Sequence, residues 1–196
     1  MKFLFTNLIL GMSALGFISC APAASNTNRV VLNTNTNTAA ANANMPSNIN
    51  KSVSSGDQEF LDNALLGGLV ELQTSGIAVT KAQNEEVRAF AQKMISDHSK
   101  ANKELKELGK EKGATLVGGT GSEEHKEMAD LSKLSGAAFD KEYVKRMVAA
   151  HKKDVAVFQK QADSGTDAGL KRFAAETLPT LKMHLEMIKN IQGKLK

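Results

Sequence analysis

Four side chains in this chain have the types and the spacing of metal ligands. Glu71, His98, His151 and His184 each lie on or beside the apolar stripe of a different long helix that the sequence predicts. Inward-pointing carboxylates and imidazoles are the groups that hold transition metals inside helical bundles. One interpretation is therefore a metal-binding or metal-dependent redox protein, with Fe, Zn, Mn or Cu held by these four residues.

Two aspartates are expected to support such a site. Asp97 and Asp154 could serve as further ligands, or could accept hydrogen bonds from the histidines and so orient them. A di-iron site is disfavoured, because it needs a Glu three residues before a His on two helices. Ile95, Val148 and Leu181 occupy the corresponding positions in this chain.

The same residues also have a purely structural interpretation. A buried histidine can bond a neighbouring acid or carbonyl, and a layer of such pairs can fix the register of the helices without any metal. The residue pattern favours this interpretation, in which the protein is a non-catalytic binding or structural module. It assigns no catalytic residue and leaves open whether the protein is an enzyme.

Helical periodicity and capping residues define the elements that position these side chains. Apolar and small residues recur at helical spacing from Asp57, which could cap a first long helix. Asn84 is expected to cap a second long helix, and Gly113 to end it. A Gly-rich crossing and a short helix over about residues 122–134 follow.

The second half of the chain also shows helical periodicity, which predicts two more long helices. A third long helix is predicted over about residues 137–162, and a fourth begins at Thr166 or Asp167. Pro179 lies inside the fourth helix and predicts a kink or a break near residues 177–178. The short turns after the first and third helices predict that residues 56–196 form an all-α, antiparallel four-helix bundle. The single long crossover, with its short helix, is the ferritin-like arrangement.

The chain begins with the pattern of an export signal. Residues 1–19 read as a lipoprotein-type signal peptide, and their end, Phe17-Ile18-Ser19-Cys20, resembles a bacterial lipobox and predicts lipidation of Cys20. Residues 20–55 are expected to form the lipid-anchored Cys20 and a disordered linker, rich in Asn, Thr and Ala. Because Cys20 is the only cysteine, an internal disulfide and a Cys-based zinc site are excluded.

The leader also predicts where the protein lies. We expect it on the periplasmic face of the outer membrane, because Ala21 stands where an Asp would resemble the signal for inner-membrane retention. The alternative is cleavage near Ala23, which would leave a soluble periplasmic or secreted protein. The expected partners are the membrane, through the lipid anchor, and a protein partner or a second copy of the chain. A net charge of +4 without an Arg-rich block argues against nucleic acid.

Four sequence blocks resemble one known family. They are GGLVEL (67–72), EVRAFAQKMISDH (86–98), LSGAAFDKEYV (134–144) and TLPTLKMHL (177–185). Together they resemble the bacterial domain of unknown function 4142, over about residues 58–192. The resemblance implies a ferritin-like bundle in an exported protein, often assigned to the outer membrane. It implies no activity.

Overall fold

The computed structural model describes residues 53–116 and 118–195. The predicted signal peptide, the lipidation site Cys20 and the predicted linker up to residue 52 lie outside the described residues. Within the described ranges, none of the helices has both the length and the apolar character needed to span a bilayer.

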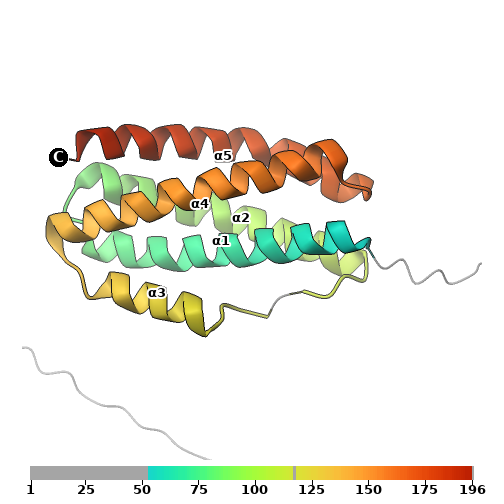
Figure 1. Cartoon of the computed structure of the whole chain (residues 1–196), viewed down its shortest axis with the longest axis horizontal. Coiled ribbons are helices and arrows are strands. Elements are labelled where there is room, and N and C mark those ends of the chain that lie inside the picture. The colour runs from blue at the N-terminus through green and yellow to red at the C-terminus, as the bar shows by residue number, and fades with distance from the viewer. Residues whose placement is uncertain (1–52, 117, 196) are drawn as a thin grey trace, which may run out of the picture. The chain divides into compact units, whose positions relative to one another are not determined.

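Five helices make up the regular structure of the described residues, which contain no strand. They are α1 (Ser55–Lys81), α2 (Glu85–Glu111), α3 (Ser122–Ser132), α4 (Gly136–Ser164) and α5 (Ala168–Lys194). The α1–α2 pair and the α4–α5 pair each form an antiparallel hairpin, with α1 packed on α4 and α2 on α5 (Figure 1). Helix α3 lies in the long connection between the hairpins. The expected all-α, ferritin-like bundle is therefore confirmed.

Capping residues set the ends of the helices where the sequence predicts them. Asn84 caps α2 by accepting hydrogen bonds from two backbone N–H groups of its first turn, at 2.8 and 3.2 Å. Asp167 caps α5 in the same way, at 2.9 Å for both bonds. Gly113 follows the end of α2 with a φ of 67°, the left-handed conformation that suits glycine there. These three predictions are confirmed.

Two other local features differ, wholly or in part, from what the sequence predicts. Helix α1 is capped by Ser54, whose hydroxyl accepts a hydrogen bond from the Asp57 N–H at 3.1 Å. Asp57 lies inside the first turn instead, where its side chain binds the α4–α5 connection. Of the kink or break expected near Pro179, the break does not occur, because α5 is continuous. Pro179 has no N–H to donate to the carbonyl of Ala175, which would be its partner in a regular helix. Both residues are exposed, so water can donate to that carbonyl instead.

A polar layer divides the core of the bundle into two apolar clusters. One cluster is centred on Phe90, Tyr143 and Ile188, and the other on Leu105 and Phe173. Between them, each long helix contributes one buried polar side chain to the layer, and these four are Glu71, His98, His151 and His184. Burial of polar groups costs free energy unless they are paired, so the contacts within this layer decide what it does.

Candidate metal centre

The structure brings the four predicted ligands together in the polar layer. Glu71 on α1 is 1% exposed, His98 on α2 is 6% exposed, and His151 on α4 and His184 on α5 are fully buried. The three imidazole rings lie with their centroids 5.5 to 5.9 Å apart. The layer is therefore closed to bulk water, and each of its side chains faces the other three helices rather than solvent.

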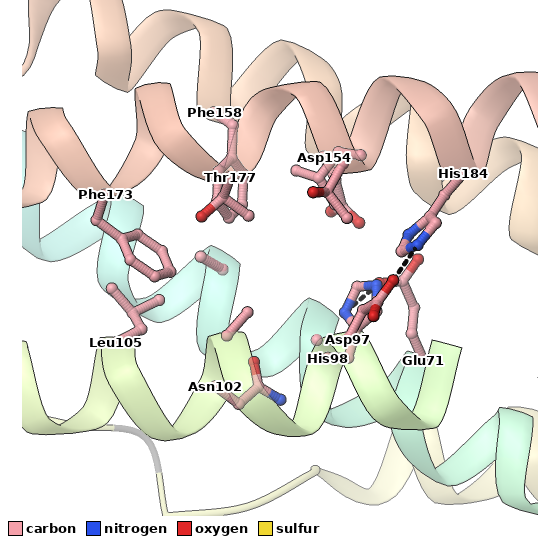
Figure 2. Close-up of a pocket in the computed structure, with 15 residues that line it drawn as sticks. Glu71, Asp97, His98, Asn102, Leu105, Asp154, Phe158, Phe173, Thr177 and His184 are labelled. Carbon is pink, nitrogen blue, oxygen red and sulfur yellow. Dashed lines mark hydrogen bonds and ion pairs between the residues drawn. The ribbon is translucent and has the colours of Figure 1, made fainter. Parts of the chain in front are cut away.

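Each histidine has one ring nitrogen against an acceptor. The Nε2 of His184 lies 2.7 Å from Asp97 Oδ2, and a dashed line marks this contact in Figure 2. The Nδ1 of His151 lies 3.0 Å from the carbonyl oxygen of Met147 and 3.0 Å from Glu71 Oε1. The Nδ1 of His98 lies 3.3 Å from Glu71 Oε2. An acceptor beside a ring nitrogen places the proton on that nitrogen, which leaves the other nitrogen with a free lone pair.

The other three ring nitrogens are buried and unpaired. No hydrogen-bond partner is found among the described residues for His98 Nε2, His151 Nε2 or His184 Nδ1. The three histidines each offer a ring nitrogen within 4.8 Å of those of the other two. A tetrahedral metal with bonds of about 2.0–2.1 Å to nitrogen needs ligand atoms about 3.4 Å apart. Small shifts of the side chains would therefore close the three rings around an ion.

Glu71 and Asp97 contact the histidines at ring nitrogens other than the three unpaired ones. The Glu71 oxygens lie beside Nδ1 of two histidines, although neither contact has the alignment of a hydrogen bond. Asp97 occupies the orienting position that the sequence predicts, and Lys93 Nζ lies 3.1 Å from its carboxylate. This arrangement makes both carboxylates candidates for orienting imidazoles.

Asp154 is placed differently from its predicted role. Among the residues that the structure covers, no hydrogen bond or ion pair joins it to a histidine, and its carboxyl group lies next to Glu71 instead. Burial and the neighbouring Glu71 carboxylate raise the pKa of Asp154 well above its ordinary value. Asp154 therefore neighbours Glu71 and does not take the predicted place beside a histidine.

The pKa shifts of His98 and His184 favour their neutral forms, and the pKa shift of Glu71 favours an ionised carboxylate. Burial lowers the pKa of His98 more than the Glu71 carboxylate raises it. Burial also lowers the pKa of His184, to about 4, despite its bond to Asp97. For Glu71 burial raises the pKa, but the contacts with His151 and His98 outweigh it and hold the pKa below its ordinary value. Neutral imidazole is the form that binds metals, and a buried carboxylate favours a nearby cation.

A small cavity adjoins the polar layer between the four long helices. Its volume is about 30 Å³. The imidazoles of His98 and His184 lie at one end, and Leu105 and Phe173 lie at the other (Figure 2). Asn102, Thr177 and Thr180 add polar side chains to its walls. The cavity is large enough for one or two water molecules.

Sequence reasoning missed several groups that shape the site. The Met147 carbonyl is a backbone acceptor and leaves no signal in the sequence. Lys93 lies four residues before Asp97, so their ion pair could have been found from helical spacing. Asn102 and Thr177 line the cavity, but polar residues at helical positions do not by themselves reveal an internal space.

Solved structures with the same fold share little sequence with this chain. A DUF305 fragment from Deinococcus radiodurans has a TM-score of 0.64 at 15% identity and covers 73% of this chain and 99% of its own. A DUF305 protein from Streptomyces coelicolor has a TM-score of 0.62 at 16% identity, covering 72% and 94%. CopM in its Cu(II)-bound form has a TM-score of 0.59 at 15% identity, covering 71% and 97%. At these identities the likeness shows the helical fold alone.

The comparison with family models identifies the family of the chain. No curated protein matches it. The model of the domain of unknown function DUF4142 matches residues 40–191, which include all five helices except the last turn of α5. This is the family that the four sequence blocks indicate. The chain therefore belongs to the DUF4142 family.

Proposed function

We propose that the bundle binds one divalent transition-metal ion through His98 Nε2, His151 Nε2 and His184 Nδ1. One observation carries this proposal: three buried histidines from three helices each have a ring nitrogen that is unpaired within the described part of the chain, and each offers a ring nitrogen within 4.8 Å of those of the other two. Hydrogen bonds at the other ring nitrogens of His151 and His184 leave the lone pairs of His151 Nε2 and His184 Nδ1 free, and Glu71 Oε2 lies 3.3 Å from the other ring nitrogen of His98. This is a metal-binding module within a domain whose family has no assigned activity.

The structural interpretation explains this geometry less well. A layer that only fixed helix register would pair its buried polar atoms with one another. Here three imidazole nitrogens lack partners, and each unpaired buried group costs about 1–3 kcal/mol. A metal ion would satisfy all three nitrogens at once. Its positive charge would also stabilise the buried Glu71 carboxylate, which lies behind two of the rings.

Among Fe, Zn, Mn and Cu, the three imidazole ligands favour Cu and Zn as candidates. Three imidazole ligands suit Zn, Cu and Fe better than Mn, which prefers oxygen ligands. Cu(II) binds nitrogen sites most tightly among the divalent ions of this series. CopM, which shares the fold, is named as a Cu(II)-bound protein. We therefore choose Cu(II) and Zn(II) as the first ions to test.

Calorimetric titration of the metal-free purified protein tests the proposal. We expect one ion of Cu(II) or Zn(II) per chain. His98→Ala, His151→Ala and His184→Ala should each weaken binding by about 100-fold or more, because each removes one of three ligands. His125→Ala is the matched control, because His125 is exposed on α3, outside the polar layer. Absence of binding to the wild-type chain, or equal binding by all four variants, would contradict the proposal.

We also propose that the chain is exported and anchored to the outer membrane through a lipidated Cys20. The proposal rests on the apolar leader that ends in Ser19-Cys20. The Streptomyces coelicolor neighbour is named as a candidate secreted protein, which agrees with export. Several acyl chains on one cysteine would hold the domain on a bilayer.

Replacement of the cysteine tests the anchor. Cys20→Ser should move the protein from the membrane fraction to the soluble fraction, or leave the leader uncleaved. Fractionation and the mass of the mature N-terminus measure both results. Unchanged membrane association together with unchanged processing would rule out lipidation at Cys20. Cleavage after Ala23 in the wild-type chain would support the soluble alternative instead.

A further inference from the structure

We infer that the metal site keeps one coordination position open toward the cavity, and that a small exogenous ligand, water or a small anion such as azide, occupies it. The inference rests on the proposed metal binding at the three histidines. It adds that the ion bound by the protein can also bind a small molecule from solution.

The donor groups in the polar layer leave a position unfilled. Within residues 53–116 and 118–195, the only cluster of potential metal ligands is formed by His98, His151 and His184. Glu71 lies against Nδ1 of two of them, and Asp97 lies against the bonded nitrogen of the third. Both carboxylates, which also line the cavity, thus contact ring nitrogens other than the three unpaired ones, and the proposed site does not count them as ligands. Zn(II) takes four ligands, and three histidines leave one of these to a molecule from solution.

The cavity supplies the space for that molecule. Two of the three histidines, His98 and His184, line it directly. Its volume of about 30 Å³ exceeds the 10–15 Å³ that one water needs, so it admits two waters or a three-atom anion. Phe158, Phe173 and Leu105 close the far end, which excludes larger molecules. The structure therefore limits the ligand to a very small one.

A surface groove gives the cavity a route to solvent. The groove runs between α2 and α5 and is lined by residues of both helices, including the exposed Lys100 and Met183. Four residues line both the groove and the cavity, and these are Asp97, Ala101, Thr177 and Thr180. All four are partly exposed. One layer of side chains thus separates the open position from water, and small ligands can pass when these side chains move.

Azide binding to the Cu(II)-loaded protein tests the inference. The chain is loaded with one equivalent of Cu(II), and sodium azide is added while charge-transfer absorption and the electron paramagnetic resonance spectrum are recorded. We expect saturable binding of one azide per copper. Ala101→Leu adds bulk to the cavity wall from α2, and Thr180→Leu adds it from α5. Each should weaken azide binding by at least about tenfold and leave Cu(II) affinity unchanged.

A matched variant controls for the added side-chain volume. Ala156→Leu makes the same change as Ala101→Leu on an exposed position of α4 and should bind azide as the wild-type chain does. Circular dichroism checks that all three variants fold. If one of the two cavity variants does not fold, the other still tests the inference. If the wild-type chain does not bind Cu(II), the proposed function fails. If Cu(II) binds but azide does not, or if both cavity variants bind azide unchanged, this inference alone is overturned.

Discussion

Two imidazoles of the polar layer have a ring nitrogen hydrogen-bonded to a neighbouring acceptor. Asp97 faces Nε2 of His184 at 2.7 Å, and the Met147 carbonyl faces Nδ1 of His151 at 3.0 Å. A metal at the free nitrogens would draw electron density from each ring and strengthen these hydrogen bonds. The acceptors are therefore part of the proposed site, and the loss of one should weaken metal binding without abolishing it.

Replacement of Asp97 by alanine tests this role. Asp97→Ala should weaken Cu(II) or Zn(II) binding by about 10- to 100-fold, because His184 loses the acceptor that orients it. The stoichiometry should stay at one ion per chain. Competition with a chelator of known affinity measures the change, and Asp130→Ala, on α3, is the matched control. Wild-type affinity in Asp97→Ala would show that the acceptor does not orient the ligand.

Sequence reasoning could place the four residues of the polar layer but not their atoms. Helical spacing assigns Glu71 and the three histidines to inward faces, and their positions within the helices put them at one level of an antiparallel bundle. Which nitrogen of His184 is free depends on Asp97, which lies 87 residues away in the chain. That Glu71 is itself a ligand stays a prediction, and its carboxylate oxygens lie 3.3 and 3.0 Å from Nδ1 of His98 and His151.

At the scale of the helices, one buried carboxylate ties the start of α1 to the α4–α5 connection. Asp57 is 1% exposed and accepts a hydrogen bond from Gln161 Nε2 at 2.7 Å. It also accepts bonds from the backbone N–H groups of Thr166 and Asp167, at 3.2 and 3.0 Å. Burial raises the pKa of Asp57, but the hydrogen bonds that it accepts outweigh burial and lower the pKa to about 2.

This shift predicts an acid-dependent contribution to stability. The pKa of Asp57 is lower in the folded chain than its ordinary value of 3.8, so its contribution is complete above about pH 4 and is lost as the pH falls toward 2. A shift of this size corresponds to about 2 kcal/mol in the free energy of unfolding. Asp57→Asn should lower stability by about this amount at pH 7 and by much less near pH 2.

Urea unfolding at pH 7, 4 and 2.5 measures the difference between the wild-type chain and Asp57→Asn. Asp62→Asn is the control on the same helix, because Asp62 accepts only a bond from Gln58, one turn earlier, among the described residues. A difference that does not change with pH would mean that the carboxylate charge contributes nothing.

The helix ends show which local features a sequence reveals. Asn84, Asp167 and Gly113 act on backbone groups within a few residues, so their roles follow from position in the chain. Asp57 was misassigned because Ser54, three residues earlier, is an equally good capping residue. The actual partners of Asp57 include Gln161, 104 residues away, and no local pattern encodes that contact.

For the molecule as a whole, the polar layer opposes folding of the metal-free chain. It interrupts the core between the cluster around Phe90 and the cluster around Phe173. Its unpaired nitrogens and buried carboxylate lose hydration without full compensation. His98 belongs to the first hairpin, whereas His151 and His184 belong to the second. A bound ion would therefore both remove this cost and link the two hairpins.

Replacement of the whole layer separates a functional site from a structural one. A variant with leucine at all four positions of the polar layer should be more stable than the metal-free wild-type chain by about 1–4 kcal/mol, because apolar packing replaces unpaired polar groups. It should also gain nothing from added metal. The wild-type chain should gain about 2.7 kcal/mol at a free metal concentration of 100 times Kd. Thermal unfolding with and without Cu(II) or Zn(II) measures both effects. If the leucine variant instead lost stability or cooperativity, the layer would be fixing helix register, because only a register role makes the polar groups necessary without an ion.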